Sequence, residues 1–346
     1  MTKPVTIHDI AKRANVSVAT VSRALADSPR VTPETRNRIK QIARELNYVP
    51  NAIARGLVTK SSKTIGMVIP DIMNPFFPEV AKGLEACANR HGFNVLLCNS
   101  DLDLQKEREH IEDLFSLRTV GIAIMPVTER VDHILYRYPP NSNIVFISYV
   151  PDQCECSGVA TNDFRSGFLG ADYLVRLGHE RVAFVGGGEN RQITRNRYHG
   201  YAAALEKAAL EPFLEPNGRN EKDPWGEAFW PGDSLLQLPE PPTAVVAYND
   251  VTAISFMGSA VSMGYRVPED ISVVGIDDVY LSNFPQIDLT TVAQDKYAIG
   301  EICAQIIIER VNDPESGKRA VRKTLEPKLV PRGSCQRLEP ARSGKK

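Results

Sequence analysis

From residue 64 onward, short apolar segments alternate with amphipathic segments that are long enough to be helices. This alternation is typical of a parallel β-sheet whose strands are joined by crossover helices. The first half of the pattern predicts helices at 77–90 and 105–117 and strands at 64–70, 94–99, 120–125 and 144–148. The pattern then restarts, with helices at 163–177, 197–208, 251–263 and 296–311 and strands at 181–186, 244–247 and 272–276. The sequence therefore predicts an α/β body of two lobes with parallel sheets.

Polar and aromatic residues follow several of these strands, at the carboxyl edge where α/β sheets bind ligands. The residues at this edge include Asn74, Phe76, Phe77, Asn249, Asp277 and Gln294. Three arginines, Arg191, Arg195 and Arg197, lie in the predicted loop after the strand at 181–186. Flat apolar faces and groups that pair with hydroxyls suit a small polyhydroxylated ring. Each residue could instead serve the core, a turn or a solvated loop, but their agreement on one edge favours a ligand site.

The charge of the chain is unevenly distributed. Residues 1–60 contain 11 Lys and Arg against 4 Asp and Glu, a net charge of +7. The remaining residues contain 30 basic and 38 acidic side chains, a net charge of −8. A basic segment gains affinity for a polyanion by releasing counterions from phosphates, so the first 60 residues are a candidate nucleic-acid-binding unit.

This basic segment has the pattern of three short helices. Thr6 can cap the first helix, and Asn15 suits the left-handed turn that ends it. Ser17 caps a second helix to about Leu25, and two short helices across such a turn form a helix-turn-helix. Thr32, followed by proline, begins a third helix that runs to about residue 46. The alternative is a small three-helix unit with a solvated basic face.

The second helix has the size and surface of a recognition helix. Its outward residues are Val18, Ala19, Ser22 and Arg23. Arg23 can pair with guanine in the major groove, and the small apolar side chains can meet thymine methyl groups. Ser17 and Thr20 suit phosphates, as the amino-terminal ends of helices do.

The segment 51–57 predicts about two helical turns capped by Asn51. A helix this short is marginal in water, so we expect it to fold on DNA, with Leu57 as an apolar wedge in the minor groove. A plain linker is the alternative interpretation.

Residues 6–57 resemble the DNA-binding head of the lactose/galactose repressor family (LacI/GalR type). The segments IGMVIPDIMNPFF, YLVRLGHERVAFVGG, AVVAYNDVTA, VPEDISVVGIDD and LTTVAQDKYAIG resemble the body of that family, which is similar to periplasmic sugar-binding proteins. The resemblance implies a transcriptional repressor that binds palindromic operator DNA as a homodimer under the control of a small effector. It implies DNA contacts for Thr6, Ser17, Val18, Ala19, Thr20, Ser22, Arg23, Thr35, Asn51, Ala54 and Leu57. It implies effector contacts for Asn74, Phe76, Phe77, Arg191, Arg197, Asn249, Asp277 and Gln294.

The resemblance also implies the domain organisation. We expect a head at 1–49, a hinge helix and linker at 50–62, an effector-binding core at 63–335 and a polar tail at 336–346. Within the core we expect lobe 1 at about 63–160 and 294–325, and lobe 2 at about 161–293 with a carboxyl-terminal strand at 325–334. The segment 211–230 departs from the family pattern, and no role is assigned to it.

The effector set is close to that of ribose-binding relatives, so a sugar is the first expectation. A purine or another metabolite is the alternative within the family, since purine-binding members use overlapping positions. Arg191 and Arg195 add positive charge that would suit a sugar acid or a phosphate.

Other function classes find less support. The glycines at 186–188 lack the third glycine of a dinucleotide-binding motif, and no phosphate-binding loop, HExxH or GxSxG motif occurs. We therefore expect no catalysis, cofactor or metal, with a cytoplasmic sugar-converting enzyme as the alternative from a different class.

No apolar stretch reaches the ~18 residues of a membrane helix. We expect a cytoplasmic protein with six reduced cysteines, and a dimer because leucine heptads are missing from the tail.

Overall fold

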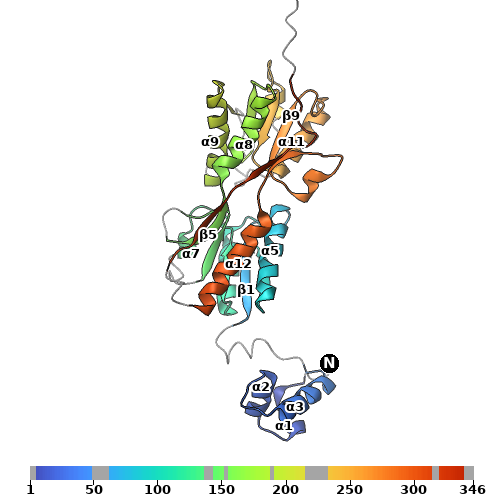
Figure 1. Ribbon diagram of the computed structural model, residues 1–346, viewed down its shortest axis with the longest axis vertical. Coiled ribbons are helices and arrows are strands. Elements are labelled where there is room, and N and C mark those ends of the chain that lie inside the picture. Colours follow the sequence, from blue (N-terminus) through green and yellow to red (C-terminus); the bar gives the residue numbers. More distant parts are fainter. Residues whose placement is uncertain are drawn as a thin grey trace, which may run out of the picture. The chain divides into compact units, whose positions relative to one another are not determined.

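The computed structural model describes residues 5–48, 62–135, 143–151, 155–187, 191–214, 233–313 and 319–338. The chain divides into two compact units, Met1–Ser62 and Lys63–Lys346. The first unit is helical, and the second combines helices with two β-sheets (Figure 1). Within the described residues, no helix is both long enough and apolar enough to cross a membrane.

The head is a bundle of three helices, α1 (Ile7–Ala14), α2 (Val18–Leu25) and α3 (Pro33–Glu45). Each helix contributes apolar residues to one small core, in which Ile10, Val21 and Ile39 are fully buried. The Asp9 carboxylate accepts hydrogen bonds from the backbone N–H and the hydroxyl of Thr6, at 2.8 and 2.7 Å. Three helices of 8 to 13 residues are thus held by a shared apolar core and by caps.

The body contains two six-stranded sheets. All strands of the first sheet pair in parallel, in the order β11 (Arg322–Leu325), β5 (Ser157–Thr161), β4 (Ile144–Ile147), β3 (Gly121–Ile124), β1 (Thr64–Ile69) and β2 (Asn94–Asn99). The second sheet is parallel except at β12, in the order β12 (Lys328–Val330), β10 (Thr290–Ala293), β9 (Ser272–Asp277), β8 (Ala244–Ala247), β6 (Val182–Val185) and β7 (Phe213–Leu214). The predicted parallel α/β architecture is confirmed.

Each sheet carries its own helices. Lobe 1 is the first sheet with α5 (Phe76–Arg90), α6 (Leu104–Ser116), α7 (Asp132–Leu135) and α12 (Lys296–Asn312). Lobe 2 is the second sheet with α8 (Asp163–Arg176), α9 (Gln192–Lys207), α10 (Asp233–Leu236), α11 (Asp250–Ser262) and the 3₁₀ turn η1 (Tyr280–Asn283). The chain passes between the sheets after β5, after β10 and after β11, so the lobes are joined by three crossings.

Each lobe is built around one helix pair in very close contact. In lobe 1, α5 packs on α12, and a Cβ added at Gly83 or Gly300 would lie 2.0 or 1.9 Å from a backbone oxygen of the other helix. In lobe 2, α8 packs on α9, and a Cβ at Gly167 or Gly200 would lie 1.8 Å from a backbone oxygen. Figure 1 shows both pairs side by side. Only glycine allows this approach, which fixes the amino-terminal ends of these helices close to one another.

Two expectations are wrong. Helix α9 begins at Gln192, five residues before the predicted start, so Arg195 and Arg197 lie in the helix and not in a loop. The residue before the helix is Arg191, whose side chain makes no capping hydrogen bond, so the usual signal of a helix start is missing. The prediction of six reduced cysteines is wrong at Cys156, which is disulfide-bonded, because a general argument about redox compartment does not fix the state of a given thiol.

Candidate functional site

The solvent-facing side of α2 carries the residues predicted to read DNA bases. Ala19, Ser22 and Arg23 are exposed and Val18 is half-buried, whereas the opposite side of the helix is buried in the head core. An exposed arginine beside small apolar side chains offers a hydrogen-bonding fork and methyl contacts on one helix face. This combination suits the edges of base pairs in a major groove.

Hydroxyl groups lie at the amino-terminal ends of all three head helices. The Ser17 hydroxyl accepts a hydrogen bond from the backbone N–H of Thr20 at 3.1 Å and so caps α2. Thr6 precedes α1, and Thr35 lies in the first turn of α3, where its N–H donates to the Thr32 hydroxyl at 3.4 Å. Helix amino-terminal ends with hydroxyls favour phosphate contacts. Three predicted DNA contacts lie outside the described residues: Asn51, Ala54 and Leu57.

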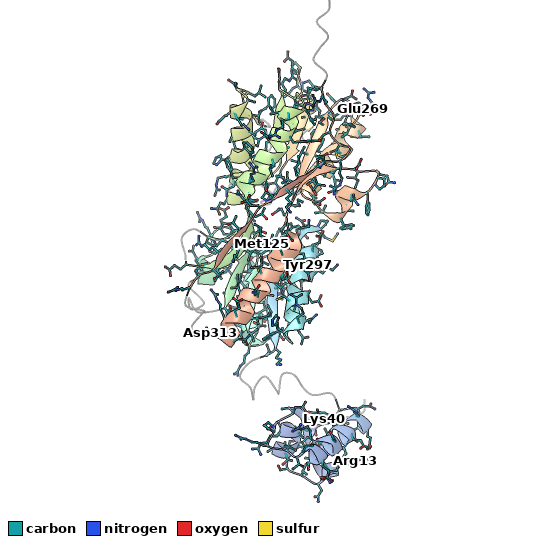
Figure 2. All side chains as sticks on the ribbon, in the orientation of Figure 1. Arg13, Lys40, Met125, Glu269, Tyr297 and Asp313 are labelled. Carbon is teal, nitrogen blue, oxygen red and sulfur yellow. The ribbon has the colours of Figure 1, made fainter. Side chains whose placement is uncertain are left out.

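In the body, a cavity of about 40 Å³ that is open to solvent is lined by residues of both lobes. Seven of the eight predicted effector residues line it: Asn74, Phe76, Phe77, Arg197, Asn249, Asp277 and Gln294. Five further residues line it: Met125, Ser148, Asp163, Ile193 and Tyr248. Figure 2 shows Met125 at the junction of the two lobes.

Arg197 lines this cavity, and two hydrogen bonds and two ion pairs hold its guanidinium group. Its Nε donates to Asp163 Oδ1 at 2.8 Å, and its Nη1 donates to the Tyr248 carbonyl at 2.6 Å. Its Nη2 lies 3.7 Å from Asp277 Oδ1, and the guanidinium lies 4.9 Å from the centre of the Tyr248 ring. Burial alone lowers the pKa of Arg197, but the two carboxylates outweigh burial and raise it above its ordinary value. Arg197 is therefore a permanent cation that orients both carboxylates.

Asp277 ends β9 and is 3% exposed. Its Oδ1 accepts a hydrogen bond from Gln294 Nε2 at 2.5 Å. Burial raises the pKa of Asp277 to about 7, although Arg197 opposes that rise, while Asp250 adds to it. Burial also raises the pKa of Asp163, again against Arg197. The charge of the Asp277 carboxylate can therefore change near neutral pH, beside a cation that cannot lose its own.

The amide and aromatic residues of the cavity are held by the ends of helices. Asn74 Oδ1 accepts a hydrogen bond from the Phe76 N–H at 3.0 Å, and Asn249 Oδ1 accepts one from the Thr252 N–H at 2.8 Å, where α11 begins. Phe76 and Phe77 are packed edge to face, with ring centres 5.3 Å apart. Rigid amides and fixed rings give a site that is formed before a ligand arrives.

Sequence reasoning missed the contributions of Asp163, Tyr248 and Ser148. Asp163 and Tyr248 matter because they contact Arg197, and these partners are 34 and 51 residues away in the chain. Ser148 follows β4, and its buried hydroxyl has no hydrogen-bond partner among the described residues. Its place after a strand was the available signal, since the other polar cavity residues follow strands too. A buried, unpartnered hydroxyl at a cavity wall is available to a ligand.

Arg191 does not line the cavity. Its Nη2 donates to the Val127 carbonyl at 2.6 Å, so the side chain joins α9 of lobe 2 to the loop after β3 of lobe 1. Arg195 lies 3.2 Å from the Glu129 carboxylate, which also accepts a hydrogen bond from the backbone N–H of Gln192. These two arginines hold the lobes to each other and leave Arg197 as the arginine that lines the cavity. No cluster of metal-binding side chains occurs among the residues that the structure describes.

Comparison with known proteins finds separate family matches in the head and in the body. Residues 6–51 match the model of the bacterial regulatory proteins of the lacI family, and residues 171–335 match the periplasmic binding protein-like domain. The HTH-type transcriptional repressor PurR of Vibrio atlanticus is 32% identical over 337 residues, covering 96% of this chain and 99% of the relative. The chain belongs to the LacI family.

Solved structures of LacI-family proteins are similar over most of the chain. A crystal structure of the lac repressor dimer bound to operator and the anti-inducer ONPF is 25% identical, with a TM-score of 0.79, and covers 96% of this chain and 100% of its own. A LacI family transcriptional regulator of Enterococcus faecium with bound ribose is 27% identical, with a TM-score of 0.67, and covers 80% of this chain and 100% of its own. This LacI-family chain is a DNA-binding transcriptional repressor with an effector-binding domain, and its relatives are repressors and not enzymes.

Proposed function

We propose that this LacI-family repressor binds a palindromic operator as a homodimer and that an uncharged, sugar-like effector in the body cavity controls its affinity for DNA. The observation that carries the effector class is the charge balance of the cavity. Arg197, the arginine among the lining residues, is held between Asp163 and Asp277. Once the pH exceeds about 7 and the Asp277 carboxyl is ionised, the positive charge of Arg197 is therefore neutralised before a ligand enters. A phosphate or a sugar acid would face two carboxylates and find no unpaired cation there.

The remaining groups suit the hydroxyls of a sugar ring. Asn74, Asn249 and Gln294 offer amide groups, and Ser148 offers an unpartnered buried hydroxyl. The edge-to-face phenylalanine pair provides apolar surface for the C–H side of a ring. The ribose-bound relative supports D-ribose as the first ligand to test. A purine is the alternative effector, since Tyr248 and the phenylalanines would also accept a flat ring.

The dimer is supported by apolar side chains that a single copy leaves in water. On lobe 1 the exposed apolar residues include Ile72, Met73, Leu96, Leu97 and Leu117. The two leucines at 96 and 97 lie on β2, which is an edge strand of its sheet. On lobe 2 the exposed apolar residues include Val261, Tyr280 and Phe284. A second copy would cover such residues. The similar lac repressor structure is itself a dimer.

The proposed mechanism follows from ligand binding at a junction of two lobes. A ligand that binds one lobe arrangement better than another shifts the population toward it. In a dimer this shift would change the spacing of the two hinge segments, which include Asn51, Ala54 and Leu57, and so change operator affinity. By reciprocity, an effector that weakens operator binding is itself bound more weakly on the operator. A repressor of this kind acts on chromosomal DNA, so the proposal places it in the cytoplasm.

The test is a thermal-shift screen of the full-length protein with neutral sugars, sugar acids, sugar phosphates and purines. Operator DNA is then selected from random duplexes with and without each hit. We expect a neutral sugar to raise the Tm and to change the affinity for a selected inverted repeat. A response confined to anionic sugars or to purines would overturn the effector class. Equal affinity for inverted repeats and random duplexes would overturn palindromic operator binding.

A further inference from the structure

The position of Lys296 is unfavourable for a cation in two respects. It is the first residue of α12, where the positive end of the helix dipole disfavours a cation, and its side chain is only 3% exposed. A buried ammonium group also loses its hydration. A cation that is both buried and at the positive end of a helix needs strong compensating contacts. Such residues concentrate at functional sites.

The compensating contacts all lie at the effector cavity or next to it. Lys296 Nζ donates to the backbone carbonyls of Asp277, at 2.5 Å, and Asp278, at 2.7 Å. It also lies 3.6 Å from the Glu79 carboxylate on α5. Asp277 ends β9 in lobe 2, whereas α5 belongs to lobe 1 and begins with the cavity phenylalanines. One ammonium group thus contacts residues of both lobes.

The two carbonyls belong to an unusual stretch of backbone. Asp277 has φ 126° and Asp278 has φ 55°, values that disfavour residues with a Cβ. Two such residues in succession need external support. The Lys296 ammonium supports the carbonyls, and Arg332 Nη2 donates to the Asp278 carboxylate at 2.6 Å. This backbone conformation sets where the Asp277 carboxylate sits in the cavity.

We propose that Lys296 is a positioning residue for the effector: it holds the Asp277–Asp278 turn so that the Asp277 carboxylate faces the ligand, and it ties this turn to α5 of the opposite lobe. The inference rests on the proposed effector function of the cavity. Lys296 itself does not line the cavity. Its effect on a ligand is therefore exerted through Asp277, by geometry and by charge.

The charge effect has a definite sign. The groups that face Asp277 are Arg197 on α9, Asp250 on α11 and Lys296 on α12, and Asp163 on α8 and Glu79 on α5 pair with these cations. Among them, Lys296 lowers the pKa of Asp277 and so favours its carboxylate form. Removing the ammonium should raise this pKa. If a sugar hydroxyl donates to the carboxylate, the pH at which affinity rises should move upward as well.

The test measures D-ribose binding to the full-length protein by calorimetry between pH 5.5 and 9, for the natural protein and Lys296→Met. We expect affinity in the natural protein to rise as the pH passes about 7. The variant should bind about tenfold more weakly, with its rise displaced upward by roughly one pH unit. Lys296→Arg keeps the charge and should keep the natural pH midpoint. Unchanged affinity and midpoint in a Lys296→Met protein that still binds operator would overturn the proposal.

A matched control separates positioning from general support. Arg332→Met removes a cation that holds the same turn without contacting Asp277, so it should lower the Tm and leave the pH midpoint in place. An equal shift in both variants would reduce Lys296 to a structural residue. If Lys296→Met does not fold, Lys296→Gln replaces it, and an unshifted midpoint in that variant overturns the proposal.

The role of Lys296 can also be tested in the ligand-free protein. If the natural protein binds neither D-ribose nor any neutral sugar, the proposed effector class fails, and the pH dependence of the Tm still reports the ionisation of Asp277. In this test, the part of the pH dependence of the Tm that comes from Asp277 should lie at higher pH in Lys296→Met than in the natural protein. A profile identical to that of the natural protein would overturn the role of Lys296 on its own.

Discussion

The head and the body place their functional side chains in opposite environments. In the head, the candidate DNA-reading residues Ala19, Ser22 and Arg23 are exposed on α2, and Val18 packs partly against a core whose buried residues are others. In the body, the candidate effector residues that line the cavity are buried, and Asp277 contacts both Arg197 and Gln294. Asp163 and Tyr248 also hold Arg197. Recognition and folding are therefore separable in the head and coupled in the body. Substitutions in the two units should reveal this difference.

The largest expected effect is that of Arg197→Met. The change leaves Asp163 buried without its cation and removes the group that orients Asp277, so we expect a loss of about 3–5 kcal/mol in the free energy of unfolding of the body. Binding of D-ribose should become undetectable. Urea unfolding and calorimetry measure the two effects.

Arg195→Met is the matched control on the same helix. Its side chain is 45% exposed and its ion pair with Glu129 is at the surface, so the expected loss is below about 1 kcal/mol. Similar losses in the two variants would contradict the coupling of site and fold that we infer for the body.

The second prediction concerns pH. Because burial raises the pKa of Asp277 from 3.8 to about 7, the unfolded chain releases this proton at lower pH than the folded chain does. The contribution of Asp277 to stability is therefore complete below about pH 4 and is lost as the pH rises to about 7, by up to about 4 kcal/mol. In Asp277→Asn, the free energy of unfolding should decrease less between about pH 4 and pH 7 than it does in the natural protein.

Burial also raises the pKa values of Asp163 and Asp250. Because Asp250 and Asp277 interact, the difference between the two proteins reports Asp277 together with its effect on Asp250. A difference that stays constant from pH 4 to pH 8 would mean that Asp277 keeps an ordinary pKa in the folded body.

The third prediction returns to the head. Arg23→Ala should weaken binding to the selected operator by about 1–3 kcal/mol and relax the preference at one base pair, because the guanidinium would pair with a base edge. The free energy of unfolding should change by less than about 0.5 kcal/mol, since the side chain is exposed. Arg13→Ala, an exposed arginine on α1, should leave the base preference intact. A loss of stability without a change in preference would place Arg23 in the fold.

The sequence predicts those features that depend on local pattern. Asn249, Asp277 and Gln294 each follow a strand, and parallel strands bring their carboxyl ends to one edge, so these residues could be found without a structure. The start of α9 could not, because Arg191 offers no capping group. The role of Asp163 could not be predicted either, because it depends on the contact with Arg197. The same holds for Arg191, which joins the two lobes. Pairings between distant residues leave no periodic signal.

The smallest expected effect tests local support within the head. The Ser17 hydroxyl accepts the Thr20 N–H at the start of α2, so Ser17→Ala should cost about 1 kcal/mol of head stability. Amide hydrogen exchange of α2 measures this loss, and the amides of the body should be unaffected because the body has its own cores. Ser22→Ala is the control: this exposed serine lies within α2, where alanine is the better helix former. If both serines proved equivalent, the cap would contribute nothing, and α2 would depend on its apolar side alone to present Arg23.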